Sequence, residues 1–323
     1  MAEPVPASAP APFTFLLAPA SWSSRNRARR RQRGDFTRSL LFGGIGLGVA
    51  GVLFAGAFWL TWQLTSYAEL GDYLLRLGLS WLFLTFLSFL AFSGVVTSLS
   101  TFFLSEDMRL LLVAPVASRR LFHARMLRTV LQASWMVVIF IVPVLAGIGA
   151  AKCAGPGYYL TALGTIVPFV VIPVALGAAV TLMLVNVFPA KRARDVLMLM
   201  GLLFAGALVV LLRFVKPERL LKVESLPDIS AFFATLQSPI TPMLPSFWAG
   251  ESLFSGLMGG VDLLHLAALW TTVAGLVVLV RMAYGRWFFT GYSKAQEARK
   301  ARFTRLTILG GIVGALPMSA VRR

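Results

Sequence analysis

Long apolar runs separated by short polar and basic segments dominate this chain. Several runs exceed the roughly 18 apolar residues that mark a membrane-spanning helix. They do not alternate apolar and polar residues as transmembrane strands do, and backbone groups in lipid must bond within their own helix. The predicted spans are about Leu40–Leu64, Leu77–Leu104, Thr129–Ala151, Tyr159–Val187, Val196–Phe214 and Val261–Tyr284. The predicted fold class is therefore all-α, a polytopic membrane helix bundle with about six transmembrane helices.

The flanking segments complete a three-part organisation. Residues 1–37 are expected to be a disordered, basic, cytoplasmic N-terminal segment, since an Ala/Pro-rich stretch precedes the arginine run Arg25–Arg33. Residues 38–285 form the predicted six-helix transmembrane domain. Within it, the semi-apolar segment 215–260 is expected to place one or two short helices in the outer leaflet. Residues 286–323 are a basic cytoplasmic tail with a short apolar end.

Composition supports the membrane class. The chain of 323 residues is 58% hydrophobic and only 13% charged, with a mean hydropathy of +0.79. A net charge of +17 would suggest a nucleic-acid partner in a soluble protein. Here the basic residues cluster at the predicted membrane edges, so topology and anionic lipid account for them and no nucleic acid is expected. The single cysteine, Cys153, excludes an intramolecular disulfide.

The distribution of charge predicts the orientation. All but six of the 30 lysines and arginines fall on one side of the predicted map. The exceptions are Arg76, Lys152, Arg213, Lys216, Arg219 and Lys222. Under the positive-inside rule this asymmetry places both termini in the cytoplasm.

The most charged segment between two long apolar spans is Ser105–Arg128. It opens with Glu106 and Asp107, continues through an apolar run and breaks at Pro115. We expect a short amphipathic helix, a turn, and then the basic start of the next span. Such a knob suits the docking of a soluble partner. The alternative is an ordinary basic loop that only sets topology.

Small and hydroxylated residues in the first two spans predict helix packing. Gly44 and Gly48 lie four residues apart and share one helix face, which allows close approach either within the bundle or at a dimer seam. Serines and threonines of the second span, such as Ser88 and Ser93, are expected to bond to backbone carbonyls of their own or a neighbouring helix. A polar transport path through these hydroxyls is the alternative.

Several chemistries have no motif in the sequence. GxxxxGK[ST] and HExxH do not occur, and no metal site is expected because His123 and His265 fall at opposite predicted membrane faces. Neither a mid-membrane carboxylate nor a nucleophile–base set is found in any span. This argues against an ion-driven carrier and an enzyme, although carbonyls of broken helices could still bind sodium.

Three features carry a resemblance to a family. They are the segment FFLSEDMRLLLVAPVASRRLF (Phe102–Phe122), the long semi-apolar segment before the sixth span, and PMLPSFWAG (Pro242–Gly250). Together they resemble the membrane permease subunit of bacterial type-2 ABC exporters over roughly Arg38–Tyr284. Relatives of this type are often longer, with a second membrane half. This chain is accordingly expected to be a half-length subunit, a split-gene product or a truncated one.

The resemblance implies a coupling helix between spans 2 and 3 that docks on a separately encoded ABC ATPase. The residues that it assigns to this docking knob are Glu106, Asp107, Arg109, Leu110, Leu111 and Pro115, with Arg119 and Arg120 holding the following helix at the inner interface. It further implies no cofactor on this chain, ATP and Mg²⁺ on the partner ATPase, and a second permease copy or second membrane half. The expected location is the bacterial inner membrane.

The leading interpretation is thus a non-enzymatic permease subunit that couples ATP hydrolysis elsewhere to export. A non-transporting membrane anchor or assembly protein that recruits a soluble protein through the same loop is the first alternative. A secondary carrier is the second. Lipid, drug, peptide and glycan all remain open as substrates, and the apolar bundle favours a hydrophobic or amphipathic one.

Overall fold

Helices make up every regular element that the structure describes. The computed structural model describes residues 33–66, 68–105, 118–187 and 241–314, together with Gly201 and Gly206. In chain order the elements are α2 (Arg33–Thr65), α3 (Ala68–Leu99), the π-helix η1 (Ser100–Leu104), α5 (Ser118–Ala151), α6 (Pro156–Val187), the 3₁₀ turn η3 (Thr241–Met243), α10 (Pro245–Leu257) and α11 (Leu263–Gly314). The predicted all-α class is confirmed.

Five of these helices are long and apolar enough to cross a membrane. The candidate spans are Leu41–Thr65, Leu70–Phe103, Ser118–Ala151, Pro156–Asn186 and Leu263–Ser293. They correspond to the predicted spans 1, 2, 3, 4 and 6, so the polytopic membrane bundle is confirmed for the described part of the chain. The predicted span Val196–Phe214 lies outside the described residues.

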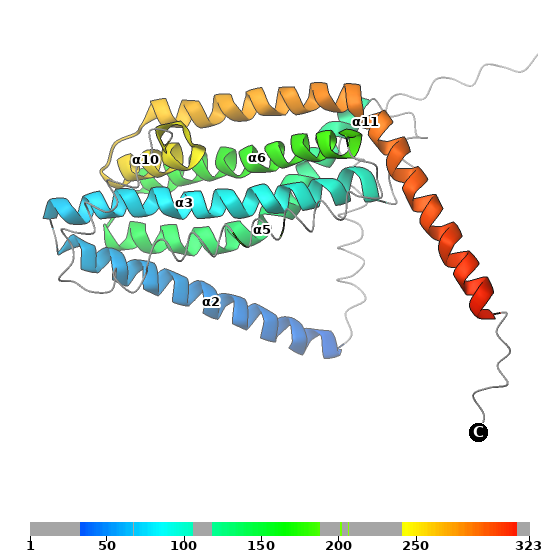
Figure 1. The fold of residues 1–323 in the computed structure, drawn as a ribbon. Helices are drawn as coiled ribbons and strands as arrows, with labels where there is room; N and C mark the ends of the chain where they lie inside the picture. The colour runs from blue at the N-terminus through cyan, green and yellow to red at the C-terminus, as the bar shows by residue number, and fades with distance from the viewer. Residues whose placement is uncertain are drawn as a thin grey trace, which may run out of the picture.

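The helices lie side by side in a bundle (Figure 1). α2 packs on α5, α3 and α6 form the centre, and α11 covers α6. We call the end at which α3 stops and α5 starts the loop end, and the opposite end the α10 end. The blue N-terminal part of α2 diverges from the bundle, and the red C-terminal part of α11 turns away from it (Figure 1).

Local sequence explains where the helices begin and end. Pro156 and Pro245 open α6 and α10, where a missing N–H costs no hydrogen bond. Cys153 takes a left-handed φ of 50° just after α5, and the Ala154 N–H bonds back to the Gly149 carbonyl. A tight turn therefore follows α5, and α6 starts three residues before the predicted Tyr159.

The structure adds detail to the sequence-based expectation at two elements. The short helix of the 215–260 segment, α10, packs against α3, α6 and α11 and contributes Ala249 and Leu253 to the core. It is a buried element because Gly250 lets it approach Ser80 on α3 closely. α11 continues past the predicted end at Tyr284 to Gly314, since the basic tail is rich in helix formers.

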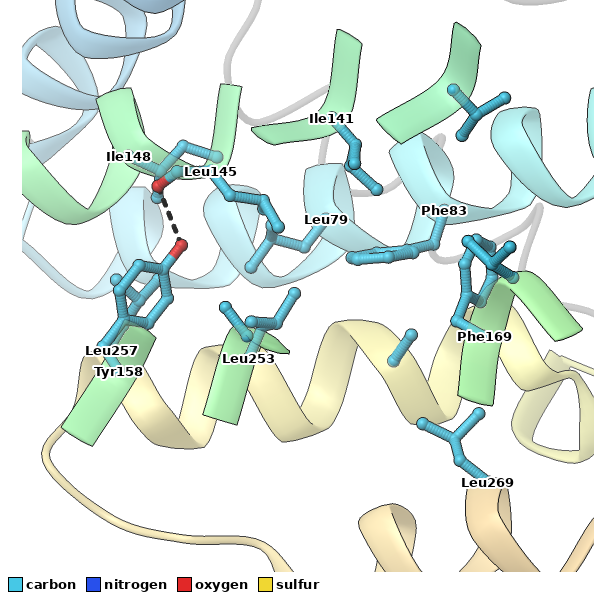
Figure 2. Close-up of a cluster of buried hydrophobic side chains, with 14 of the residues drawn as sticks. Leu79, Phe83, Ile141, Leu145, Ile148, Tyr158, Phe169, Leu253, Leu257 and Leu269 are labelled. Atoms are coloured by element: carbon cyan, nitrogen blue, oxygen red, sulfur yellow. Dashed lines mark hydrogen bonds between the residues drawn. The ribbon is translucent and has the colours of Figure 1, made fainter. Parts of the chain in front are cut away.

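The larger of two apolar cores lies toward the α10 end (Figure 2). Phe83 on α3 and Phe169 on α6 meet edge to face, with ring centroids 4.7 Å apart. Tyr158 is buried with them and donates its hydroxyl proton to the Leu145 carbonyl at 3.0 Å, the contact dashed in Figure 2. The second core lies at the loop end, and five of its buried side chains are aromatic: Phe102, Phe103, Phe122, Tyr284 and Phe288.

Candidate functional site

The predicted docking knob falls largely outside the described residues. Glu106, Asp107, Arg109, Leu110, Leu111 and Pro115 all lie there. The structure does describe both stems of this connection, Ser105 after η1 and Ser118 at the start of α5. The assignment of these residues to partner docking therefore stays a prediction. The described geometry of this connection is that of its two stems.

The first stem is a π-helical turn. α3 passes into η1, whose C-cap Ser105 takes an extended conformation with φ −65° and ψ 129°. π-turns are rare, and they occur frequently at functional sites. Phe102 and Phe103 of this turn are both buried. The chain thus leaves the bundle from an anchored, non-standard turn.

The second stem carries the predicted pair Arg119 and Arg120. Both lie in the first turn of α5, at the loop end, with Arg119 exposed and Arg120 half-buried. The His123 ring nitrogen Nδ1 lies 2.7 Å from the Arg119 carbonyl oxygen one turn earlier. The role of both arginines at the inner interface stays a prediction.

Arg125 is the functional candidate that sequence reasoning missed, since it was counted only among the basic residues that set topology. Its side chain is 3% exposed. Its Nη1 donates to the Ser105 hydroxyl at 3.0 Å and lies 3.4 Å from the Thr101 carbonyl. A pattern could have found it, because Arg125 shares the i, i+3, i+7 face of Phe122 and Thr129, both fully buried.

An aromatic cluster joins the two stems to α11. The Tyr284 ring of α11 lies 5.7 Å from Phe102 of η1 and 5.3 Å from Phe122 of α5, measured between ring centroids. Phe288 stacks on Tyr284 at 4.3 Å. All four rings are buried. The loop end is therefore a dry, packed junction of η1, α5 and α11.

Ion pairs gather at the α10 end. Arg76 on α3 makes a bidentate pair with Glu251 on α10, both N–O distances being 2.6 Å. The Glu251 side chain is only 8% exposed, whereas Arg76 is 51% exposed. Lys152 pairs with Asp72 at 2.5 Å. Arg76 and Lys152 were predicted to lie on the side opposite to the connection between Ser105 and Ser118, and they do lie together at the α10 end of the bundle.

Asp262 caps the start of α11. Its Oδ1 accepts from the backbone N–H groups of Leu264 and His265, and its Oδ2 lies 2.6 Å from His265 Nδ1. Burial alone would raise the pKa of Asp262, but the hydrogen bonds from His265 and Leu264 outweigh it and hold that pKa below its usual value. The Asp262 carboxylate therefore joins the first backbone N–H groups of α11 to the His265 ring.

The glycine face predicted for helix packing has no partner in the described part of the chain. A Cβ placed on Gly44 or Gly48 would meet nothing within 4 Å. Close crossings lie elsewhere: a Cβ on Gly177 of α6 would lie 2.6 Å from the Gly94 carbonyl carbon of α3, and one on Gly147 of α5 would lie 2.5 Å from the Phe54 carbonyl oxygen of α2. Packing within this bundle therefore uses a different glycine pair, and the dimer-seam alternative for Gly44 and Gly48 stays a prediction.

The polar groups of the spans follow the expected pattern. Ser88 donates to the Leu84 carbonyl of its own helix, and Ser93 to the Ala133 carbonyl of α5. His123 and His265 lie at opposite ends of the bundle, as predicted. Among the described residues, no group of three or more His, Cys, Asp or Glu side chains could hold a metal ion.

Comparison with known proteins gave one match. A family model whose description reads "Putative ATP-binding cassette" matches residues 30–312, which is most of the chain. No curated protein and no solved structure matched.

Proposed function

The chain belongs to the ABC-type family that this description names, and from that premise we propose that it is the permease subunit of an ATP-driven exporter. The observation that carries the proposal is a combination of two facts. The family is ABC-related, whereas the described chain is a membrane-type helical bundle with five candidate spans. The sequence also contains no GxxxxGK[ST] loop, the usual phosphate cradle of an ATPase.

A division of labour follows from the proposal. ATP and Mg²⁺ bind a separate ATPase subunit, and this chain supplies the membrane pathway together with a second permease copy or second membrane half. The connection between Ser105 and Ser118 docks on the ATPase from the cytoplasmic side. The loop end is then the cytoplasmic end, which agrees with the basic residues Arg119 and Arg120 at that end.

The first test is a detergent pull-down of the tagged chain from its native host. An ABC ATPase in stoichiometric yield is the expected result. Isolation of the intact, folded chain with no ATPase would refute the permease assignment and favour the membrane-anchor alternative. Transport that follows an ion gradient without ATP would favour a secondary carrier.

A double substitution tests the docking surface itself. Leu110→Asp together with Leu111→Asp places two charges on the predicted apolar knob, so the ATPase yield should fall by at least about tenfold, the effect of desolvating unpaired charge at an interface. Membrane insertion should be unchanged. Ser118→Asp is the matched control, because it adds a carboxylate on the exposed second stem outside the knob. Equal ATPase yield from the double variant and wild type would show that the docking assignment is wrong.

A further inference from the structure

The buried guanidinium of Arg125 needs an explanation beyond topology. Arginine stays charged at all relevant pH values, and burying its charge is costly unless hydrogen bonds satisfy it. An arginine that only sets topology would be expected to stay exposed, as Arg119 of the same helix is. Arg125 instead points into the loop-end junction, where its side chain is 3% exposed.

Two hydrogen-bond partners of Arg125 lie on the opposite stem of the same connection. Ser105, whose hydroxyl is 3.0 Å from Nη1, is the last described residue before residues 106–117. The Thr101 carbonyl, at 3.4 Å from the same nitrogen, belongs to the π-turn η1. Arg125 itself follows the connection on α5. One side chain thus ties the entry and the exit of the predicted docking segment together.

Buried aromatic rings surround the hydrogen bonds of Arg125 to Ser105 and Thr101. Phe102 of η1 and Phe122 of α5 flank the Tyr284 ring of α11, and all three are buried. In such an apolar setting a charged hydrogen bond is stronger than in water. A push on either stem therefore moves η1, α5 and α11 as one unit rather than bending the connection alone.

We propose that Arg125 is a positioning residue that transmits movement of the 105–118 connection to α5 and α11. The proposal rests on the permease function above, and it goes beyond docking, because Arg125 lies inside the bundle and does not contact the ATPase. In this mechanism the docked ATPase moves the connection, and the Arg125 contacts to Ser105 and Thr101 carry that displacement into the bundle.

The test uses the full chain with its ATPase in lipid vesicles and two measurements. Amide hydrogen exchange of residues 100–105 reports local opening of η1, and ATPase turnover with and without the permease reports coupling. The variants are Ser105→Ala, which removes one acceptor, and Arg125→Lys, whose ammonium cannot reproduce the planar donor geometry. Tyr292→Phe is the matched control: Tyr292 stacks on Phe288 of the same cluster, with ring centroids 5.7 Å apart, and its buried hydroxyl has no hydrogen-bond partner in the described part of the chain.

Ser105→Ala should speed exchange in η1 about fivefold and lower permease-dependent ATPase turnover about fivefold, the effect of losing one such hydrogen bond. Arg125→Lys should do both more strongly, with an unchanged yield of bound ATPase. Tyr292→Phe should leave both readouts at the wild-type level. Ser105 is only half-buried, so Ser105→Ala should fold normally. It therefore tests the contact between Arg125 and Ser105 even if Arg125→Lys lowers the yield of folded chain.

Three results would overturn the proposal. Faster exchange with unchanged ATPase coupling would make Arg125 a purely structural residue. Unchanged exchange in Ser105→Ala and Arg125→Lys would show that the tie does not hold η1. Equal loss of coupling in Tyr292→Phe would assign the effect to general loosening of the cluster. If the wild-type chain binds no ATPase, the permease function fails instead, and the exchange measurement alone decides whether the tie exists.

Discussion

The crossing of α3 and α6 at Gly94 and Gly177 makes a quantitative prediction about what holds the bundle together. In Gly177→Ala the new Cβ would lie 2.6 Å from both the Gly94 carbonyl carbon and the Val95 nitrogen. These are backbone atoms, so no side chain can turn aside. Carbon atoms in contact normally lie about 3.5–4.0 Å apart. The two helices must therefore separate by about 1 Å.

The magnitude follows from what this separation removes. Forcing a methyl group into a packed site costs about 1–3 kcal/mol. The same shift would break the hydrogen bond from Thr181 Oγ1 to the Val95 carbonyl, now 3.1 Å long, at about 1 kcal/mol. Replacing glycine by alanine inside a helix stabilises the helix by about 1 kcal/mol, which offsets part of this loss. We expect a net loss of about 2 kcal/mol, which lowers the folded-to-unfolded ratio about 30-fold.

Denaturant unfolding of the purified chain in detergent micelles, followed by tryptophan fluorescence, measures this loss. Gly44→Ala is the matched control, since it makes the same change in a helix where a Cβ would meet nothing within 4 Å. It should be neutral or slightly stabilising. The reasoning is refuted if Gly177→Ala unfolds at the wild-type denaturant concentration, or if Gly44→Ala loses as much stability.

Two further predictions concern the α10 end. Arg76→Ala should destabilise the fold by about 2 kcal/mol, because it leaves the Glu251 carboxylate, which is 8% exposed, without its partner. This is less than the cost of breaking a fully buried pair, since the Arg76 side chain is half-exposed. Glu251→Gln should cost less, and equal stability of both variants and wild type in the same unfolding assay would contradict the prediction. Asp262 has a lowered pKa in the folded chain, so its stabilising contribution is complete above the ordinary value of 3.8 and is lost as the pH falls through the lower folded value. Between pH 5 and about pH 3 the melting temperature should therefore fall less in Asp262→Asn than in wild type, because asparagine keeps the cap without the charge. An equal fall in both proteins would count against the Asp262 interaction.

The proposed transport mechanism depends most on the loop end. There the π-turn, the aromatic cluster and Arg125 form one packed junction directly beside the predicted docking segment. The α10 end is organised differently, by ion pairs that join α3 to α10 and to the turn after α5. A bundle that is dry and rigid at the end nearest its proposed ATPase is suited to receive mechanical input there.

The sequence by itself determined the helices and their order. Span length, apolar composition and basic flanks are local properties that the bilayer imposes, because each backbone group in lipid must bond within its own helix. Five predicted spans therefore match described helices to within several residues at most ends. The start of α5 at Ser118 agrees with the basic helix start expected after Pro115, and the largest difference is the continuation of α11 to Gly314, where basic residues extend a helix beyond the apolar core.

Only the tertiary structure decided which faces of those helices meet. Gly44 and Gly48 have the spacing of a packing motif and contact nothing described, whereas Gly94 and Gly177, far apart in sequence, form the close crossing. Arg125 looks like the other arginines of its segment until Ser105 is seen beside it. The reason is physical: in a membrane the lipid-facing and protein-facing surfaces of a helix are equally apolar, so hydropathy marks a span without marking its contact face.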